Sequence, residues 1–262
     1  MKHYRVCLSI AGSDPSGGAG IQADLKTFSA LGCYGAAAVT ALTVQSTLGV
    51  TQVVPVDAAL VGAQVDAVLA DLHPAAVKIG QLPTAAVVHA VARSLRACPP
   101  QWVVLDPVMV SSSGRRLMDA DAVEALCDDL LPLCSLLTPN RAEAAVLAGR
   151  GATCAEGGAG PAVLVTGGDA DGLPCDVLCA DGLRRELTGR RVLTRNDHGT
   201  GCTLSSAVAA LLARGVALPD AVARAKAYVE AALEAGAGVE VGQGRGGMNH
   251  FFAPETLIIE DF

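Results

Sequence analysis

A run of small residues, Gly199, Thr200, Gly201 and Cys202, begins a strongly helical stretch over residues 200–214. Small side chains leave the first N–H groups of a helix uncovered, and the helix dipole adds about half a positive charge at that end. Such a turn can hold an anion. The same field would lower the pKa of the Cys202 thiol and favour a thiolate, although most free cysteines are simply small buried apolar residues. The position of Cys202 in the glycine turn favours the functional interpretation.

A glycine-rich stretch, "GSDPSGGAG" over residues 12–20, lies between an apolar run and a helix-like segment. Its glycines do not have the G-x-G-x-x-G spacing of a dinucleotide-binding fold, and no G-K-[ST] ending marks a Walker-type phosphate loop. Its backbone N–H groups could still face a ligand at the start of the helix. From this stretch alone, a ligand-binding loop and a structural turn are both open.

A third set of polar residues lies where two other strand-like runs end. Asn140 and Glu143, in "TPNRAEA", stand three apart on the first turn of a helix, and their oxygens suit a hydrated Mg²⁺ beside phosphates. Glu143 alone is also the negative charge that a helix N-terminus favours. Asp106, in "VVLDPVM", ends a central strand, which is where open α/β sheets bind their ligands.

The elements that must position these residues alternate in type along the chain. Short apolar runs predict buried strands over 5–12, 35–44, 75–80, 102–108, 135–139 and 162–168. Segments with helical spacing of apolar positions lie between them, over 20–32, 57–72, 84–97, 119–132 and 140–149. This alternation indicates an α/β fold, with a parallel sheet and right-handed crossovers.

The pattern changes in the last third of the chain. Residues 175–189 predict a hairpin on an Asp-Gly turn, and helices follow over 200–214 and 218–236. The segment 149–161 is a glycine-rich surface loop. Because no linker or repeat divides the sequence, we expect a single domain over residues 1–262.

Composition excludes several classes of protein. The net charge is −7 and no basic block is longer than a pair of residues, so nucleic-acid binding is not expected. The uncharged run over 27–56 contains too many Gly, Ser, Thr and Gln residues for a membrane span, and the N-terminus does not predict a signal peptide. Nine cysteines without a C-x-x-C pair predict reduced thiols in a cytoplasmic protein.

Read together, these motifs resemble the ribokinase-type small-molecule kinases, and within them the hydroxymethylpyrimidine/phosphomethylpyrimidine kinases of thiamine biosynthesis. The motifs that carry the resemblance are "AGSDPSGGAGIQADLKTFSALG", "VTALTVQST", "KIG", "VVLDPVMV", "TPNRAEA", "HGTGCTLSSA" and "VGQGRGGMNHF". They span nearly the whole chain in order. The resemblance implies a ribokinase-like three-layer α/β/α fold with a central, mostly parallel sheet. It also implies Mg·ATP-dependent phosphorylation of 4-amino-5-hydroxymethyl-2-methylpyrimidine and then of its monophosphate, and a homodimer.

The resemblance also implies roles for individual residues of the glycine turn and the pyrimidine pocket. Cys202 matches the family's proposed catalytic base, and Gly199, Thr200 and Gly201 match its anion hole. The residues expected against the pyrimidine are Gln45, which would read its amino edge, with Asp24, Gly12, Gln81 and Val108.

On the nucleotide side, the residues expected to bind ATP and its phosphates are Asn140, Glu143, Thr166 and Gly168. Asp106 and Glu143 are the expected metal ligands. Phosphoryl transfer has a loose transition state, so positioning and charge stabilisation supply most of the catalysis. The segment 110–117, "VSSSGRRL", is expected to be a mobile flap over the site.

The chain departs from the family pattern at three places. Gln81 stands where many members have Met, Thr166 stands where many have a lysine that reaches the phosphates, and the segment 148–162 is shorter by about a helix. Gln81 and Thr166 leave pyridoxal kinase activity open as an alternative or second activity. A non-catalytic ligand-binding relative is disfavoured by the intact motifs, and a nicotinamide-dependent oxidoreductase is disfavoured by the glycine spacing.

Overall fold

A central sheet runs through the computed structural model, which describes residues 2–111, 114–149, 160–168 and 172–261. Six strands run in one direction: β2 (Val6–Ser13), β3 (Tyr34–Ser46), β5 (Ala76–Ile79), β6 (Trp102–Leu105), β7 (Leu136–Leu137) and β8 (Ala162–Val165). Two strands, β4 (Gly49–Pro55) and β9 (Cys175–Ala180), run the opposite way, and β10 (Leu183–Thr188) pairs antiparallel with β9. Over the described residues these nine strands have the order β10-β9-β8-β7-β6-β5-β2-β3-β4. The expected mostly parallel sheet is confirmed.

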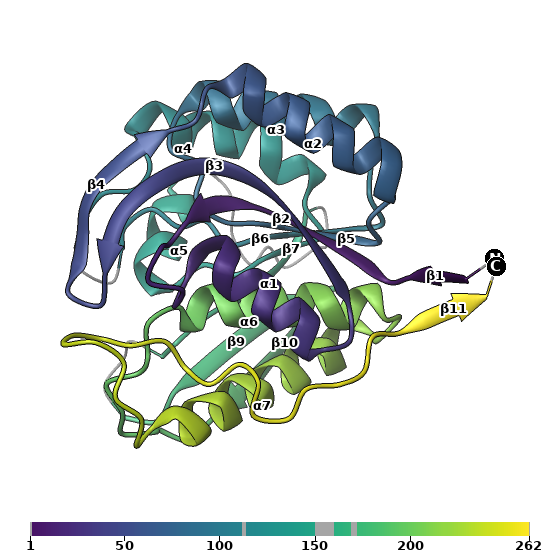
Figure 1. Ribbon diagram of the computed structural model, residues 1–262. Helices are drawn as coiled ribbons and strands as arrows, with labels where there is room; N and C mark the ends of the chain where they lie inside the picture. The colour runs from purple at the N-terminus through teal and green to yellow at the C-terminus, as the bar shows by residue number, and fades with distance from the viewer. Residues whose placement is uncertain (1, 112–113, 150–159, 169–171, 262) are drawn as a thin grey trace.

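Helices cover both faces of the sheet, as Figure 1 shows. One layer holds α2 (Ala58–Leu72), α3 (Ala85–Ala97) and α4 (Ala120–Ala125), and the short α5 (Arg141–Ala148) contributes Leu147 to the core beneath them. The opposite layer holds α1 (Gly20–Ala30), α6 (Thr200–Ala213) and α7 (Leu218–Gly236). This is the three-layer α/β/α arrangement that the sequence predicts.

Each face of the sheet has its own apolar core. Successive residues of a strand point to opposite faces, so Leu8 and Ile10 of β2 pack under α2 and α3, whereas Cys7 packs under α6. Both cores consist mainly of Ala, Val and Leu. Small side chains let the helices approach the sheet closely, which explains how a sequence with so few aromatic residues buries its core.

The expected helix over 119–132 has a different form in the structure. The α-helix α4 ends at Ala125, and a π-helical turn (Leu126–Leu130) and a 3₁₀ turn (Leu131–Leu133) complete the segment. Pro132 lies at the start of the 3₁₀ turn and has no N–H to continue the α-helical hydrogen bonds. The apolar periodicity is retained because Leu126 and Leu130 are both buried.

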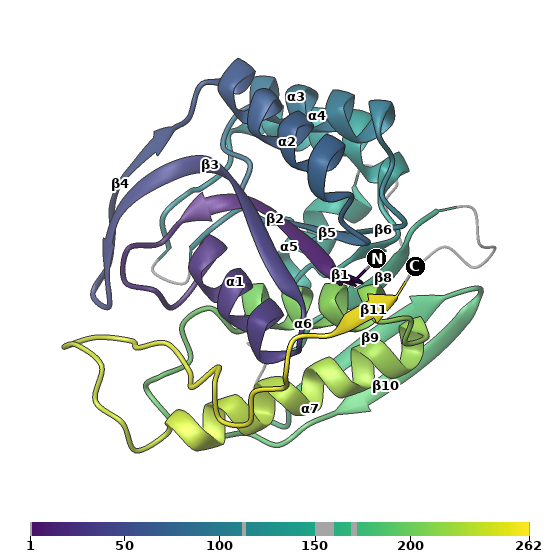
Figure 2. The ribbon, with the colours of Figure 1, turned by 45° about the vertical axis from the view of Figure 1, so that its right-hand side comes forward.

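Three strands were not expected from the sequence. β4 pairs with the long β3 to form a ribbon that curves away at one edge of the sheet (Figure 1). A separate two-stranded sheet joins β1 (Lys2–Tyr4) to β11 (Ile259–Asp261), which brings the two ends of the chain together (Figure 2). The expected hairpin is confirmed as β9 and β10, with positive φ at Asp181 and Gly182 in the turn.

The order in which the strands are added to the sheet reverses at β2. The chain places β3 and β4 on one side of β2 and then returns to add β5, β6, β7 and β8 on the other side. In open α/β sheets, ligands bind at the carboxyl ends of the strands beside such a switch point. The loop after β2 is the first glycine stretch, so this stretch lies where a ligand is expected. No helix in the described part of the chain is both long and apolar enough to span a membrane.

Candidate active site

A cavity of about 600 Å³ opens at the carboxyl ends of β2, β5, β6 and β7. Most of the residues expected in the site line it: Gly12, Gln45, Gln81, Asp106, Val108, Asn140, Glu143, Thr166, Gly168, Gly199, Thr200, Gly201 and Cys202. These residues come from loops that are far apart in the sequence. The fold therefore assembles them into one site, and Asp24 is the exception.

The glycine turn before α6 forms one wall of the cavity. Gly199 is the N-cap residue, with φ +85°, and no side chain caps the helix. A Cβ at Gly199 would collide with the carbonyl oxygen of Gly18, so only glycine fits between the two loops. The helix thus begins without a side chain over its first N–H groups, and Gly199 to Cys202 all line the cavity.

The first glycine stretch is both a structured turn and part of the cavity wall. The Asp14 carboxylate accepts hydrogen bonds from the backbone N–H groups of Ser16 and Ala19, each at 2.8 Å. Burial raises the pKa of Asp14, but hydrogen bonds from His198 and from these neighbours outweigh burial and hold the pKa below its ordinary value. Gly12, Asp14, Ala19 and Gly20 line the cavity, so the two interpretations of this stretch are compatible.

Cys202 lies in the expected place but has a different acidity. Burial raises the pKa of the thiol to about 12, and the carboxylates of Asp24 and Asp106 add to this shift. The Lys78 ammonium and the backbone N–H of Gly20 act in the opposite direction without overcoming burial. The expected lowering of the Cys202 pKa is therefore wrong, because desolvation outweighs the Lys78 charge and the Gly20 hydrogen bond.

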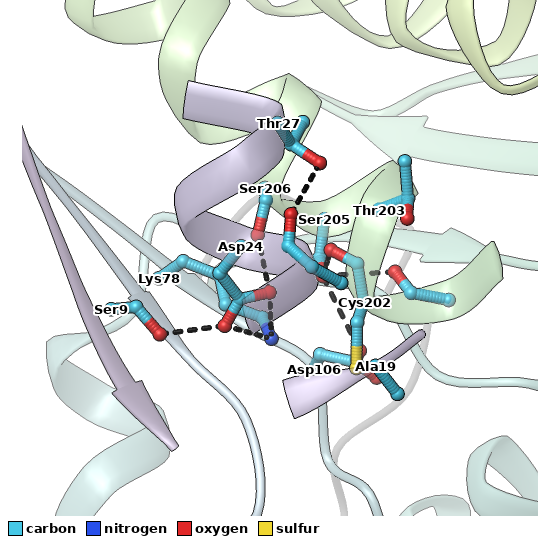
Figure 3. A network of polar contacts seen from close by, with 12 residues as sticks. Ser9, Ala19, Asp24, Thr27, Lys78, Asp106, Cys202, Thr203, Ser205 and Ser206 are labelled. Carbon is cyan, nitrogen blue, oxygen red and sulfur yellow. Dashed lines mark hydrogen bonds and ion pairs between the residues drawn. The ribbon is translucent and has the colours of Figure 1, made fainter. Parts of the chain in front are cut away.

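Asp106 faces the same turn from the end of β6. Its side chain is buried and accepts a hydrogen bond of 3.3 Å from the Ser205 hydroxyl. Burial raises the pKa of Asp106 to about 6, with Lys78 lowering it and Asp24 raising it. At neutral pH the carboxylate form prevails. Asp106 lies beside Cys202 (Figure 3), and its Oδ2 is 3.7 Å from the position that a Cβ at Gly201 would take.

Asp24 lies behind the cavity wall rather than against a substrate. Its carboxylate accepts hydrogen bonds from Ser9 Oγ at 2.6 Å, from Ser206 Oγ at 2.7 Å and from Lys78 Nζ at 2.9 Å. Neither Asp24 nor Lys78 has an exposed side chain, and Figure 3 shows this network beside Cys202. The expectation that Asp24 contacts the substrate is corrected: all its oxygens already have protein partners in the interior.

Asn140 and Glu143 form a capping box at the start of α5. The Asn140 side chain accepts a hydrogen bond from the Glu143 N–H, and Glu143 Oε2 accepts one from the Asn140 N–H, both at 2.9 Å. Glu143 Oε1 accepts a third from the Met109 N–H at 3.3 Å. Both carboxylate oxygens of Glu143 are therefore bonded to the backbone, which explains how a buried acidic residue is tolerated beside the cavity.

The expected pyrimidine pocket is lined from β3 and from the end of β5. Thr43 and Gln45 point into the cavity because they alternate with the outward-facing residues of β3. Gln81 is almost fully buried and donates a hydrogen bond to the Leu117 carbonyl at 3.3 Å. A Cβ at Gly12 would collide with Gln81 Oε1, so the Gln81 amide packs closely on the first glycine loop.

Several residues of the cavity were not identified from the sequence. Lys226 of α7 lines it and forms an ion pair of 2.6 Å with Asp176 of β9. Arg190 and Arg191 line the same side, near Thr166 and Gly168. No spacing rule connects these cations to the motifs, because they come from the strand–helix connection and from α7. His198 precedes the glycine turn within "HGTGC", and its position in that motif was the one available signal.

The expected flap over residues 110–117 is described in part. Val110 and Arg116 form an antiparallel bridge, and Val110, Ser111 and Leu117 line the cavity. Residues 112–113 lie outside the described residues, as do residues 150–159 of the shortened segment 148–162. The proposed roles of the flap and of that segment therefore stay predictions.

Comparisons with known proteins identify the family. The family model described as phosphomethylpyrimidine kinase matches residues 14–249. The chain belongs to this family. It is 52% identical over 259 residues to a hydroxymethylpyrimidine/phosphomethylpyrimidine kinase of Rhizobium meliloti (strain 1021), covering 94% of this chain and 97% of that protein.

Two solved structures are similar to this family member. The crystal structure of phosphomethylpyrimidine kinase from Clostridium difficile 630 has a TM-score of 0.74 at 37% identity, over 87% of this chain and 99% of that one. An ADP complex of Bacillus subtilis pyridoxal kinase has a TM-score of 0.83 at 32% identity, over 94% of this chain and 97% of that one. The protein is thus a kinase with the ribokinase-type fold, and the similar Bacillus subtilis enzyme was solved with ADP bound.

Proposed function

We propose that the cavity binds 4-amino-5-hydroxymethyl-2-methylpyrimidine on its β3 side and ATP on its α5 and β8 side, with the N-terminus of α6 between them. The protein is a hydroxymethylpyrimidine/phosphomethylpyrimidine kinase, and it phosphorylates this pyrimidine and then its monophosphate in thiamine biosynthesis. This placement is supported mainly by the uncapped turn from Gly199 to Cys202, which lines the cavity.

In the proposed transfer, the hydroxymethyl oxygen attacks the γ-phosphorus of ATP, a new O–P bond forms, and the bond to the β,γ-bridging oxygen breaks to release ADP. The N–H groups of Gly201 and Cys202 stabilise the charge of the transferring phosphoryl group. The hydroxyl proton passes to the thiolate form of Cys202, whose own proton has first left to water. With its raised pKa, Cys202 can orient the hydroxyl oxygen as a neutral thiol, and it becomes an acceptor only after losing its own proton.

The second phosphorylation has the same bond changes, with a phosphate oxygen of the monophosphate as the nucleophile. This oxygen is already ionised or nearly so at neutral pH, so the second step does not depend on a strong base. The dependence on Cys202 should therefore be greater for the first phosphorylation than for the second.

The oxygen-rich side of the cavity fits Mg²⁺, which prefers carboxylate, phosphate and water ligands. We propose that Asp106 holds the ion directly or through a water, while Glu143 acts through water because its oxygens already accept backbone hydrogen bonds. No group of three acidic, His or Cys residues suited to a metal occurs among the described residues, so ATP and water would supply the other ligands. When bound, Mg²⁺ would neutralise phosphate charge.

Pyridoxal is the second candidate substrate. The similarity to Bacillus subtilis pyridoxal kinase and the departures at Gln81 and Thr166 favour testing it. Arg190, Arg191 and Lys226 border the nucleotide side of the cavity. We propose that they supply the positive charge that a lysine at position 166 would otherwise provide.

We also propose that the protein forms a homodimer through the outer face of the β3–β4 ribbon. Leu42, Val44 and Val54 lie on this face, opposite the cavity-lining Thr43 and Gln45, and Leu42 pairs with Val54 across the two strands. All three are at least 45% exposed. An apolar face on an edge ribbon is typical of an interface between subunits. Sedimentation of Val44→Asp against wild type tests it: the variant should be monomeric.

The experiment that tests the function measures ADP release with Mg·ATP and each of three acceptors: the pyrimidine, its monophosphate and pyridoxal. Wild type should phosphorylate both pyrimidines. Cys202→Ala should lose at least 100-fold in turnover of the first substrate, while Cys98→Ala, an exposed cysteine at the end of α3, serves as the control. Turnover of pyridoxal alone would overturn the substrate assignment. Full activity of Cys202→Ala would overturn the role of the thiol.

A further inference from the structure

His198 joins the segments of the cavity wall on the proposed pyrimidine side. Its Nε2 atom lies 2.9 Å from Asp14 Oδ2 and 2.9 Å from the amide nitrogen, Nε2, of Gln45. Its backbone N–H donates to the Gly246 carbonyl at 3.0 Å. The ring packs against Gly18, where a Cβ would lie 2.5 Å from Cδ2. The proposed phosphoryl transfer uses none of these contacts, so the role of His198 is a separate question.

The contact with Asp14 decides which His198 nitrogen carries hydrogen. The Asp14 carboxylate already accepts hydrogen bonds from the N–H groups of Ser16 and Ala19, which favours its ionised form. An ionised carboxylate can only accept. Nε2 must therefore carry a hydrogen, whether or not the other ring nitrogen is also protonated.

Donor and acceptor counting then fixes the orientation of the Gln45 amide. In the structure the Gln45 NH₂ faces His198, which sets two donors against each other at 2.9 Å, and a half-turn of the amide exchanges its nitrogen and oxygen. On the other side, the Thr43 hydroxyl lies 3.2 Å from Gln45 Oε1 and, closer, 2.9 Å from the Ser13 carbonyl oxygen, which can only accept. The single hydrogen of Thr43 goes to Ser13, so Thr43 offers Gln45 an acceptor. Both neighbours require the amide oxygen toward His198 and the NH₂ toward Thr43.

We infer that His198 is a positioning residue: by sharing its single Nε2 hydrogen between Asp14 and the Gln45 oxygen in a three-centre bond, it fixes the amide in one orientation, and the site thereby selects a 4-aminopyrimidine over its 4-oxo analogue. This inference rests on the proposed function, in which Gln45 faces the pyrimidine. An aminopyrimidine edge offers a ring-nitrogen acceptor beside an NH₂ donor, whereas the 4-oxo analogue offers N–H beside a carbonyl, the reverse order. A fixed amide pairs with one of these edges, and an amide free to make a half-turn pairs with both.

The test measures kcat/KM for the aminopyrimidine and for its 4-oxo analogue, each with saturating Mg·ATP. His198→Phe keeps a ring against Gly18 but has no donor, and it should lower the ratio of the two kcat/KM values at least 10-fold. His198→Gln places an N–H near the original Nε2 position and should restore most of the ratio. The KM for ATP should change less than twofold in both variants, because a general loss of the cavity wall would alter it as well.

Thr43→Val is a second, independent test. It removes the Thr43 hydroxyl, the other group that orients the Gln45 amide, while keeping the shape of the side chain. This variant should also lower the ratio, and it keeps the inference testable if His198→Phe fails to fold. An unchanged ratio in His198→Phe or Thr43→Val, together with a collapsed ratio in Gln45→Leu, would overturn the inference. An unchanged ratio in Gln45→Leu would instead show that the pyrimidine lies elsewhere, and the proposed placement would fail first.

Discussion

The Lys78 ammonium lies 2.9 Å from each carboxylate oxygen of Asp24, and neither side chain is exposed. Burial alone would lower the pKa of Lys78, but Asp24 and the other nearby acidic groups raise it above its ordinary value. Hydrogen bonds from Ser9 and Ser206 complete the shell around Asp24. This charge pair and its hydrogen bonds therefore connect β2, β5, α1 and α6 beside Cys202 (Figure 3).

Breaking this pair should destabilise the protein strongly. Lys78→Met leaves the Asp24 charge buried without its cation, and we expect it to lower the free energy of unfolding by about 3–5 kcal/mol. Urea unfolding at pH 7 measures the loss. The double variant Lys78→Met with Asp24→Leu should recover part of it, because no uncompensated charge then remains.

The matched control is the exposed pair of Arg184 and Glu186 on β10, 2.7 Å apart. Arg184→Met should cost no more than about 1 kcal/mol, because water screens this pair. If Lys78→Met lowered the free energy of unfolding as little as Arg184→Met, the buried pair of Lys78 and Asp24 would not be important for stability.

The buried Asp106 predicts a pH dependence of stability with a definite sign. Its pKa is raised from 3.8 to about 6 in the folded state. Between those values the folded state keeps a proton that the unfolded state has released, so stability falls as pH rises from about 4 to about 6. Above this window the charged carboxylate costs about 2–3 kcal/mol.

The measurement compares urea unfolding of wild type and Asp106→Asn at pH 4.5 and pH 7.5. The variant should gain stability relative to wild type by about 2 kcal/mol across this range, since the neutral amide does not titrate. A constant difference between the two proteins would mean that Asp106 has its ordinary pKa in the folded state.

The sequence predicted the layers of the fold well because the apolar periodicity is strong in each strand and helix. It did not predict β4, whose residues over 49–55 lack a buried face because they form one half of an edge ribbon. Nor did it predict β1 and β11, which are three residues each and exist only as partners of one another. Elements that depend on one distant partner leave little local signal.

In the candidate site, too, the sequence indicated what local motifs and topology determine, and missed what depends on distant residues. Most of its residues were identified because loop motifs at strand ends converge at one edge of a parallel sheet, which is a property of the topology. Asp24 was expected against the substrate but forms a buried ion pair with Lys78. Nothing in the local sequence around Asp24 indicates that Lys78, 54 residues away, pairs with it. The predicted lowering of the Cys202 pKa was wrong for a related reason. The helix dipole can be inferred from the local sequence, whereas desolvation depends on all the residues packed around the thiol.

The raised pKa of Cys202 predicts slow reaction with alkylating reagents, because only the thiolate attacks them. At pH 8, without ligands, iodoacetamide should modify the exposed Cys98 at least 10-fold faster than Cys202. Mass spectrometry of peptides taken at successive times gives both rates in one sample. Faster modification of Cys202 than of Cys98 would show that the helix N-terminus does stabilise a thiolate.

The glycine turn before α6 gives a prediction with its own internal control. Gly199 and Gly215 both have positive φ, +85° and +80°, so alanine is strained by about 1 kcal/mol or more at either position. They differ in surroundings, because nothing lies within 4 Å of a Cβ at Gly215, whereas a Cβ at Gly199 would meet the Gly18 carbonyl. Gly215→Ala should therefore be less stable than wild type but have the same kcat.

Gly199→Ala must push the turn away from the Gly18 loop, which moves the first N–H groups of α6 relative to the cavity. We expect its kcat to fall at least 100-fold, because a displaced donor stabilises the transferring phosphoryl group poorly. Steady-state kinetics and urea unfolding of the two variants, measured together, separate strain from displacement. Equal kcat values in the two variants would show that the close approach of Gly199 to Gly18 is not needed for transfer.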